Sequence, residues 1–414
     1  MLSWRQLLTT ATALEELHAV VKDARDEIGA DLARALNLYL AFALDKGLNY
    51  NSQLCAWHST RVSVANTFDR HDFSFKWSFA EFDGASALIP WAVDQIVDAY
   101  SGIAKLANRQ EGVLHHEQRS SSTVLQGSAT ELPLASKSVD AIVTDPPYYD
   151  NVMYAELSDF FYVWLKRAIG ESWPELCSLS LTDKDKEAVA NSSRFTVVAT
   201  KRKGKRTLGE KSASDLADEH YEFLLTQSFR EAHRVLTDNG VLTVMFTHKR
   251  VDAWDTLGQA ILNAGFSINS SWPVHTESEN SLHQAKKNSA SSTIFLTCRK
   301  RGSSSPAYWT DIRSDVALAA REAASEFASI GLSGIDLTIS TFGPVLSVLS
   351  RNWPVYTGEL DSVGAPQVLR PDVALDLARE EVSRLKKRGL LGGRDVEFDR
   401  VTDWYLLAWA DFAA

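Results

Sequence analysis

The segment VDAIVTDPPYYD, residues 139–150, places residues with useful chemistry at the end of an apolar run that we expect to form a buried strand. Asp145 follows the apolar run, two prolines come next, and Tyr148 opens an aromatic pair. Because prolines fix φ and lack an N–H, such a turn presents rigid carbonyl acceptors. The Asp145 carboxylate and the Pro146 carbonyl can each accept one hydrogen of an amino group, which aims the nitrogen lone pair at an electrophile. Tyr148 offers a flat face to a base taken out of its helical stack.

The neighbours of this turn are further candidates for a substrate site. In an open α/β sheet, ligands bind in the crevice beyond the carboxyl ends of the strands. We therefore predict that Tyr149 and Asn151, beside the turn, contact the substrate. His248, at the end of a second apolar strand, is a third candidate. For His248 the alternative is a polar strand end in solvent.

An alternation of apolar strands and amphipathic helices follows residue 121 and would position this turn. The pattern predicts strands over 122–127, 141–144, 241–248, 267–275 and 292–300, and helices over 215–235 and 253–264. Asn239-Gly240 is typical of a turn, and Gly265 is typical of a helix C-cap. Strands linked through helices, with two strands in succession at the end, predict an α/β fold whose parallel sheet has an antiparallel end.

Three regions are expected on this basis. Residues 1–120 form a mainly helical region, residues 121–301 contain the strands and the motif, and residues 302–414 form a C-terminal helical region. The aromatic-rich stretch over 57–82 is interpreted as core or domain packing.

The charge balance excludes a general attraction to polyanions. The chain carries 43 Lys and Arg against 53 Asp and Glu, a formal net charge of −10, so a nucleic-acid surface must be a local basic patch. The strongest candidate is an irregular stretch with five cations in six residues: Lys201, Arg202, Lys203, Lys205 and Arg206. We predict that it contacts nucleic-acid phosphates, with a solvated loop as the alternative. Residues 386–388 are interpreted as the polar face of a helix.

Cysteine and histidine usage does not indicate a metal site. Cys55, Cys177 and Cys298 lie more than a hundred residues apart, which is wrong for a zinc site built from close pairs. The stretch HTESENSLH, residues 275–283, has no two histidines four residues apart on one helix face, so we expect no metal. No signal peptide and no apolar run near the ~18 residues of a membrane span is visible. We therefore expect a cytoplasmic protein with reduced thiols and no membrane partner.

The motif at residues 145–148 resembles that of a known family. Asp-Pro-Pro-Tyr is similar to the catalytic motif of amino-methyltransferases that act on nucleic-acid bases, where it is typical of adenine enzymes. The flanking segments DPPYYDNVMYAELSDFFYVWLKR, REAHRVLTDNGVLTVMFTHKRVDAW and PVHTESENSLH are more specific. They resemble large bacterial adenine-specific DNA methylases that carry a zinc ribbon in their N-terminal half. The resemblance spans residues 4–301 and, more loosely, the C-terminal region.

This resemblance implies a Rossmann-like fold that transfers a methyl group from S-adenosylmethionine to the exocyclic amino group of adenine in DNA. By it, the catalytic residues are Asp145, Pro146, Pro147 and Tyr148. Transfer would be direct, and Asp145, Gly127 and Ser128 would contact the donor. Two alternatives stay open: a methyltransferase that acts on RNA or a protein amide, and a non-catalytic DNA-binding subunit or decayed remnant.

Two departures from the family pattern concern the methyl donor. Enzymes of this kind bind it at a glycine-rich turn, where only glycine lets the backbone approach closely, and this chain contains no Gly-x-Gly. An acid also usually stands where this chain has Ser128. In the family, the glycine loop and the zinc ribbon lie upstream of the part that this chain resembles. We therefore expect an incomplete sheet with an exposed edge at residues 141–144, completed by a separately encoded half or by a helix from residues 1–100.

Overall fold

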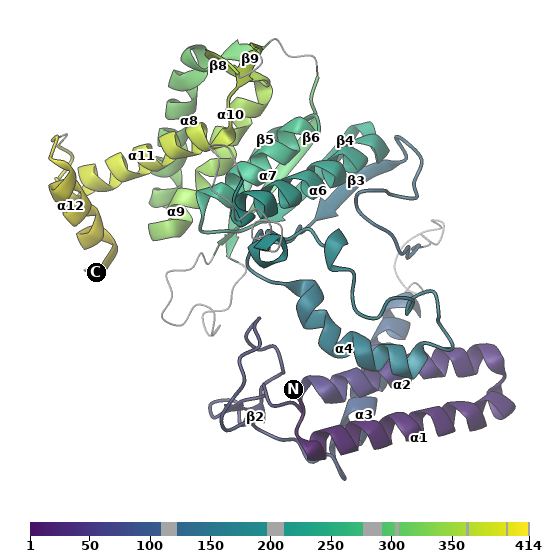
Figure 1. The fold of residues 1–414 in the computed structure, drawn as a ribbon. Coiled ribbons are helices and arrows are strands. Elements are labelled where there is room, and N and C mark those ends of the chain that lie inside the picture. Colours follow the sequence, from purple (N-terminus) through teal and green to yellow (C-terminus); the bar gives the residue numbers. More distant parts are fainter. Residues whose placement is uncertain are drawn as a thin grey trace, which may run out of the picture. The chain divides into compact units, whose positions relative to one another are not determined.

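The computed structural model describes residues 1–108, 122–196, 211–275, 292–302, 306–361, 364–394 and 396–412. The chain forms two compact units. Unit 1 comprises Met1–Val124 and Val152–Glu187, and unit 2 comprises Leu125–Asn151 and Ala188–Ala414. Figure 1 shows the elements of each unit.

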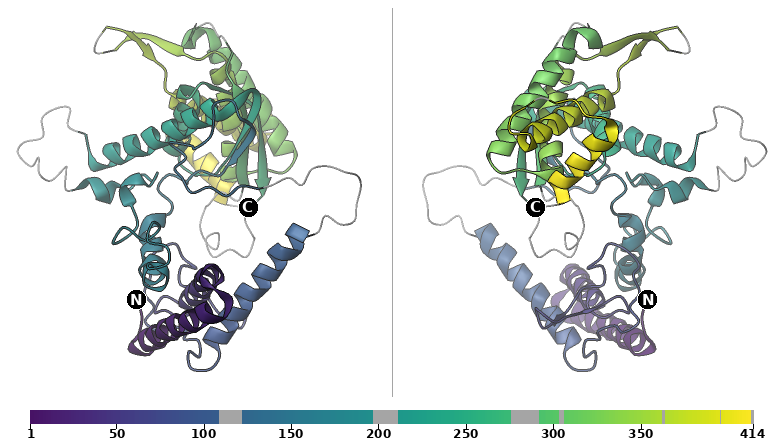
Figure 2. Two further views of the ribbon diagram at one scale, coloured as in Figure 1. Left: turned by 90° about the vertical axis from the view of Figure 1, so that its right-hand side faces the viewer. Right: turned by 90° about the vertical axis from the view of Figure 1, so that its left-hand side faces the viewer.

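Unit 1 is a helical assembly. Its helices are α1 (Trp4–Ile28), α2 (Ala30–Asn49), α3 (Leu88–Asn108) and α4 (Tyr154–Ile169). A capping box of Ser3 and Gln6 begins α1, and Gly29, at φ 84°, provides the break before α2. The apolar faces of α1, α2 and α4 enclose a core that includes Leu17, Leu44 and Phe160. Figure 2 shows α1 and α2 side by side.

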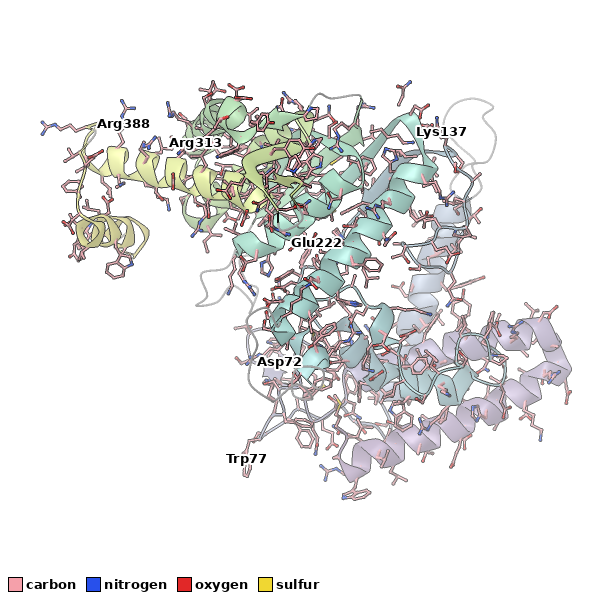
Figure 3. The ribbon with its side chains drawn as sticks, turned by 45° about the horizontal axis from the view of Figure 1, so that its top comes forward. Asp72, Trp77, Lys137, Glu222, Arg313 and Arg388 are labelled. Carbon is pink, nitrogen blue, oxygen red and sulfur yellow. The ribbon has the colours of Figure 1, made fainter. Side chains whose placement is uncertain are left out.

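The aromatic-rich stretch of unit 1 differs from the prediction. It contains only the short hairpin of β1 (Trp57–His58) and β2 (Ser63–Val64), and Phe68 packs edge-on against Phe160. However, Trp57 and Phe75 are more than half exposed, and Trp77 is fully exposed (Figure 3). The interpretation of this whole stretch as core is therefore wrong, because aromatic density alone does not determine burial.

Unit 2 contains a four-stranded mixed sheet. Its strands are β3 (Val139–Thr144), β4 (Leu236–Phe246), β5 (Phe266–His275) and β6 (Ser292–Lys300), in the order β3-β4-β6-β5. β3 and β4 are parallel, whereas β4, β6 and β5 pair antiparallel. The helices between the strands are α6 (Ala213–Val235) and α7 (Val251–Asn263). The predicted α/β class is confirmed, but the predicted parallel sheet with an antiparallel end is only partly present, because β3 and β4 are the one parallel pair among the described strands of this sheet.

The C-terminal region completes the core of unit 2. It contains β7 (Ala307–Tyr308), α8 (Trp309–Ser329), α9 (Gly334–Ser340), α10 (Phe342–Arg351), β8 (Val355–Leu360), β9 (Pro366–Val368), α11 (Pro371–Leu390) and α12 (Arg400–Phe412). The β8–β9 hairpin projects from the other elements of unit 2 (Figure 2). Phe246 of β4 packs against Trp254 of α7, which packs against Phe342 of α10. The expected division at 120 and 301 therefore differs from the observed one, since residues 302–414 share a core with the sheet and α4 belongs to unit 1.

Two local predictions are corrected by the backbone. Residues 122–127 form no strand, although their β-branched composition favoured one. Asn239 and Gly240 lie inside β4 rather than in a turn, and the register between β3 and β4 shifts between Val139 and Ala141. The turn signal thus marks an irregularity within a strand. Two short 3₁₀ helices, η1 (Lys184–Lys186) and η2 (Ser192–Phe195), complete the secondary structure.

β3 is an edge strand with a largely exposed surface. Within the described residues it pairs with β4 alone, and the Val143 side chain is 72% exposed. The apolar run was expected to be a buried strand, and this expectation of burial is wrong because no described strand pairs with its outer edge and Val143 is exposed. The exposed edge expected at residues 141–144 is present.

The two faces of the sheet also differ. Leu242, Val244 and Phe246 alternate along β4 and are fully buried against helices. The residues between them point to the other face, where ladder partners lie side by side. On that face Val143 pairs with Thr243, and Trp272, paired through β6, is 55% exposed. One face of the sheet is covered by helices of unit 2, and the other is only partly covered.

Candidate active site

The DPPY turn, which we define as residues 145–151, begins where β3 ends. Thr144 pairs with Val244 of the parallel strand β4, so the carboxyl ends of both strands lie at one edge of the sheet. Asp145 is exposed, Pro146 is buried, and Pro147 and Tyr148 are half-buried. The Tyr148 ring meets Phe246 edge-on, with 5.7 Å between the ring centroids. The motif therefore lies at the carboxyl edge of the strands, as predicted.

The carbonyls of the two prolines differ in their hydrogen bonds. The Pro147 carbonyl accepts from the Tyr221 hydroxyl at 2.5 Å and from the Tyr149 N–H at 2.9 Å. In contrast, no described residue donates a hydrogen bond to the Pro146 carbonyl or to the Asp145 carboxylate. Both acceptors that were predicted to bind an amino group are thus left without a hydrogen bond by the described residues.

Tyr149 anchors the turn in the core. Its side chain is 2% exposed, and its hydroxyl donates to the Asp218 carboxylate at 2.5 Å. Burial and this hydrogen bond raise the pKa of Tyr149, and burial also raises the pKa of Asp218. The Tyr149 backbone has φ 57°, a left-handed conformation that bulky residues rarely adopt. Such a backbone persists only where its surroundings determine it, and here Tyr221 also accepts from the Tyr149 N–H at 3.3 Å.

His248 connects the end of β4 to the turn. The side chain is 3% exposed, and its Nδ1 accepts from the Arg250 backbone N–H at 3.1 Å. Because Nδ1 accepts, the proton of the neutral ring lies on Nε2, which is 3.2 Å from both Asp150 Oδ1 and Asn151 Oδ1. Trp254 donates to the His248 carbonyl at 2.8 Å and fixes this strand end.

Arg250 balances the charge beside the turn. One guanidinium nitrogen donates to Asp150 Oδ2 at 2.8 Å and another to Asp252 Oδ2 at 2.8 Å. The hydrogen bond from His248 and the nearby Arg250 charge lower the pKa of Asp150. The guanidinium also lies 5.4 Å from the centre of the Tyr149 ring. Asp150 is therefore a charged anchor of the turn.

The structure brings several of the predicted residues together and assigns them different positions. Asp145 to Asn151 and His248 form one cluster, in which the Tyr149 and His248 side chains are buried and hydrogen-bonded to other residues of unit 2. They are placed to orient the turn. The predicted donor residues Gly127 and Ser128 are both exposed, and Ser128 forms a bridge with Glu131 and hydrogen bonds with Thr130, all within its own turn. Residues 201–206 and 276–283 lie outside the described residues.

Sequence analysis missed the partners of the turn on α6. Asp218 and Tyr221 are three residues apart and therefore share one face of this helix. A hydroxyl and a carboxylate on the apolar side of an amphipathic helix are a detectable signal, because buried polar groups require partners. The spacing of Asp218 and Tyr221 does not reveal that their partner is the DPPY turn, which lies some seventy residues earlier in the chain.

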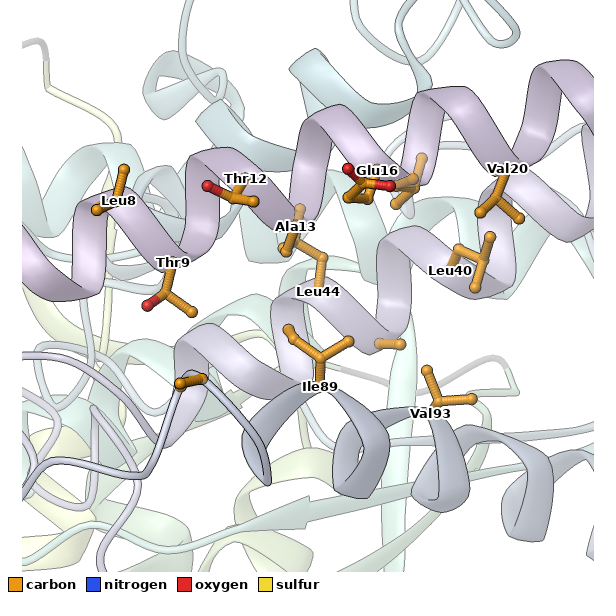
Figure 4. Close-up of a pocket in the computed structure, with 14 residues that line it drawn as sticks. Leu8, Thr9, Thr12, Ala13, Glu16, Val20, Leu40, Leu44, Ile89 and Val93 are labelled. Carbon is orange, nitrogen blue, oxygen red and sulfur yellow. The ribbon is translucent and has the colours of Figure 1, made fainter.

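Unit 1 contains a separate apolar cavity of about 500 Å³ between α1, α2 and the start of α3. Figure 4 shows Leu8, Ala13, Leu40, Leu44 and Ile89 around it, with Glu16 as its charged lining residue. Its chemistry is unlike that of the DPPY turn. Within the described residues, no cluster of His, Cys, Asp or Glu is arranged to bind a metal ion.

The helices of the described ranges are each too short or too polar to cross a lipid bilayer. The three cysteines are buried and free. Comparison of the chain with protein-family models, with curated proteins and with solved structures found no match.

Proposed function

We propose that this chain presents adenine in DNA for methylation of its exocyclic amino group, with S-adenosylmethionine as the methyl donor. The observation that carries the proposal is the contrast at the DPPY turn. The Asp145 carboxylate and the Pro146 carbonyl accept no hydrogen bond from the described residues, whereas the Pro147 carbonyl accepts two. An amino group has two hydrogens, which matches these two available acceptors.

The chain's own residues would act by orientation. Asp145 and Pro146 would each accept one amino hydrogen, which directs the nitrogen lone pair out of the base plane. Tyr148 would lie against the extruded base, and Tyr149, Tyr221 and His248 would keep the turn rigid. The donor, when bound, supplies a methyl group on a sulfonium. Asp145 would then be placed to accept the proton that the amino group loses.

Two of the residues that were predicted to contact the donor do not lie in an enclosed site. Gly127 and Ser128 are exposed, the stretch around them is not a strand, and no glycine-rich turn follows β3. We therefore propose that a second polypeptide, with the glycine loop and zinc ribbon of the resembled family, binds the donor. Its strand would pair with the free edge of β3, where Val143 is 72% exposed, and so complete a Rossmann-like sheet.

The exposure of Gly127 and Ser128 also favours one alternative. A non-catalytic DNA-binding subunit would keep the DPPY turn and lack a donor site. Calorimetry distinguishes the two, since the partner proposal expects S-adenosylmethionine binding only by the assembly of both chains. Tight binding by this chain alone, purified as a stable monomer, would contradict the proposed partner.

Methyl transfer by the native assembly tests the function. We suggest tagging the chain at its chromosomal locus, purifying it with its partners and supplying labelled donor with DNA from a strain that lacks the gene. Label is expected in N6-methyladenine. Asp145→Ala should lower the rate by roughly 10²–10³-fold, since it removes one of two groups that position the amine.

The matched control is Asp140→Asn, which changes an exposed aspartate five residues earlier and should leave the rate unchanged. Both variants should unfold within ~0.5 kcal/mol of the wild type, because both side chains are exposed. Label in RNA or in protein, or full activity of Asp145→Ala, would contradict the proposal.

A further inference from the structure

The C-terminal end of unit 2 contains a hollow of about 820 Å³ between α8, α11, the segment that follows α11 and the start of α12. Five cations line it: Arg321, Arg384, Lys387, Arg388 and Arg394. Three carboxylates also line it: Glu381, Glu397 and Asp403. The described residues that line the hollow therefore have a surplus of two positive charges (five cations less three carboxylates), in a chain whose net charge is −10.

A buried acid fixes two of the guanidinium groups. Glu381 is 4% exposed and binds Arg321 at 3.2 Å and Arg384 at 2.7 Å. The side chains of both arginines remain more than half exposed. Because one carboxylate binds a nitrogen of each, these guanidinium groups are oriented before any ligand arrives, which lowers the entropy cost of binding.

Two further arginines contact no carboxylate among the described residues. The Arg388 Nε donates to the Gly393 carbonyl at 3.3 Å, and the two terminal nitrogens donate to no described residue. Gly392 and Gly393 have φ 60° and 86°, so the chain can turn there and place Arg394 at the same hollow. Residues 384–394 contain five cations and no acid. Figure 3 shows Arg388 at the far end of α11.

Helix α12, which contributes Asp403 to the hollow, also has exposed aromatic side chains. Trp404, Tyr405 and Trp409 are 69%, 58% and 58% exposed. The Tyr405 and Trp409 rings lie 6.4 Å apart and tilted by 31°. Exposed aromatic planes beside a basic groove are typical of surfaces that bind nucleic acids through phosphates and base faces.

We propose that this hollow binds the phosphate backbone of DNA and is a sequence-independent contact surface of the chain. The inference rests on the proposed function for the choice of DNA. The guanidinium group of arginine can donate two hydrogen bonds to phosphate oxygens. The concave shape would bring several arginines to one DNA strand. Residues 386–388 had been interpreted as a solvated helix face. The structure adds the turn at Gly392 and Gly393, which brings Arg394 to the end of that helix.

Salt-dependent binding of a fluorescently labelled duplex to the full chain tests this inference. In Arg388→Gln/Arg394→Gln, neither substitution breaks an ion pair of the described residues. We expect roughly tenfold weaker binding, with a log–log salt slope reduced by about 0.9 for each phosphate that is no longer neutralised. Arg313→Gln, at an exposed arginine of α8 labelled in Figure 3, is the matched control and should bind as the wild type.

Three results would overturn the inference. They are an unchanged slope in the double variant, an equal loss of affinity in the Arg313→Gln control, and a Trp fluorescence change with phosphatidylserine vesicles but none with the duplex. The Arg388→Gln/Arg394→Gln variant is read by the salt slope of duplex binding, whereas Asp145→Ala is read by methyl transfer. Failure of the hollow to bind DNA therefore leaves the methyl-transfer test intact, and loss of methyl transfer in Asp145→Ala leaves the hollow intact.

Discussion

The DPPY turn of unit 2 and the helical core of unit 1 differ in how completely their buried polar groups are hydrogen-bonded. Around the turn, Tyr149, Tyr221 and His248 all have partners between 2.5 and 3.3 Å. In the described part of unit 1, four buried side-chain atoms have no hydrogen-bond partner: Asn37 Oδ1, Asp45 Oδ1, Asn66 Oδ1 and Trp173 Nε1.

This difference indicates where rigidity is required. An unpartnered buried polar atom costs about 1–3 kcal/mol, so unit 1 is destabilised while the turn is not. Under the function proposed above, a rigid turn would hold the Asp145 and Pro146 acceptors in place for the amino group. We therefore expect substitutions in unit 1 to change stability and substitutions around the turn to change methyl transfer.

The largest expected effect on stability is the pH dependence caused by Asp45, a residue of α2. Burial raises the pKa of Asp45 to about 8, far above its ordinary value of 3.8. Between these values the unfolded chain is ionised at Asp45 while the folded chain retains the proton. The free energy of unfolding therefore falls as pH rises, by up to about 1.4 kcal/mol per pH unit.

Asp45→Asn removes this titration and should flatten the fall, as measured by calorimetric unfolding between acid and mildly alkaline pH. Asp31→Asn, at an exposed position of the same helix, should keep the wild-type slope. If the free energy of unfolding of Asp45→Asn fell with pH as steeply as that of the wild type, Asp45 would not be the buried acid that destabilises unit 1.

An intermediate effect is expected from Tyr221→Phe, which removes the hydroxyl that binds the Pro147 carbonyl. One of the two donors to that carbonyl is lost, which should cost about 1 kcal/mol of unfolding free energy. The methyl-transfer rate of the native assembly should fall roughly tenfold, because the turn is less well oriented. DNA affinity should not change. Tyr308→Phe, at a tyrosine that is 53% exposed, is the control, and equal rate losses in both would argue against positioning by Tyr221.

The smallest effect is expected from Arg250→Gln, which removes the ion pair with Asp150. The Arg250 side chain is 44% exposed, so the loss of stability should stay below about 1 kcal/mol. Because the pKa of Asp150 is lowered in the folded chain, the stabilisation is present above its ordinary pKa of 3.8 and is lost as pH falls through the lowered value. Urea unfolding at neutral and at acid pH checks this. A loss of stability that persists undiminished in acid would contradict the assigned pair.

Local patterns in the sequence predicted much of the sheet and the position of the turn. The apolar runs over 267–275 and 292–300 lie within a residue of β5 and β6, and Gly265 follows α7 with φ 90°. These features are predictable because strand alternation and helix ends depend on neighbouring residues. The Asp145 carboxylate and the Pro146 carbonyl could be predicted as acceptors because both belong to one short motif.

Features that depend on distant contacts were not predicted. The link between Tyr221 and Pro147 spans 74 residues, and the packing of Phe342 on Trp254 joins the C-terminal region to the sheet. The left-handed backbone of Tyr149 results from these contacts and not from its residue type. The exposure of Trp77 likewise depends on how the surrounding chain folds.

Methylation of the host genome tests the central claim most directly. The chromosomal gene is replaced by the Asp145→Ala form, with an Asp140→Asn strain as the control, and N6-methyladenine is mapped across the genome by single-molecule sequencing. We predict that methylation of adenine at one sequence motif disappears in the Asp145→Ala strain and persists in the control, at equal protein levels. An identical adenine methylation map in the Asp145→Ala and wild-type strains would contradict the assignment of Asp145 as an acceptor for the amino group.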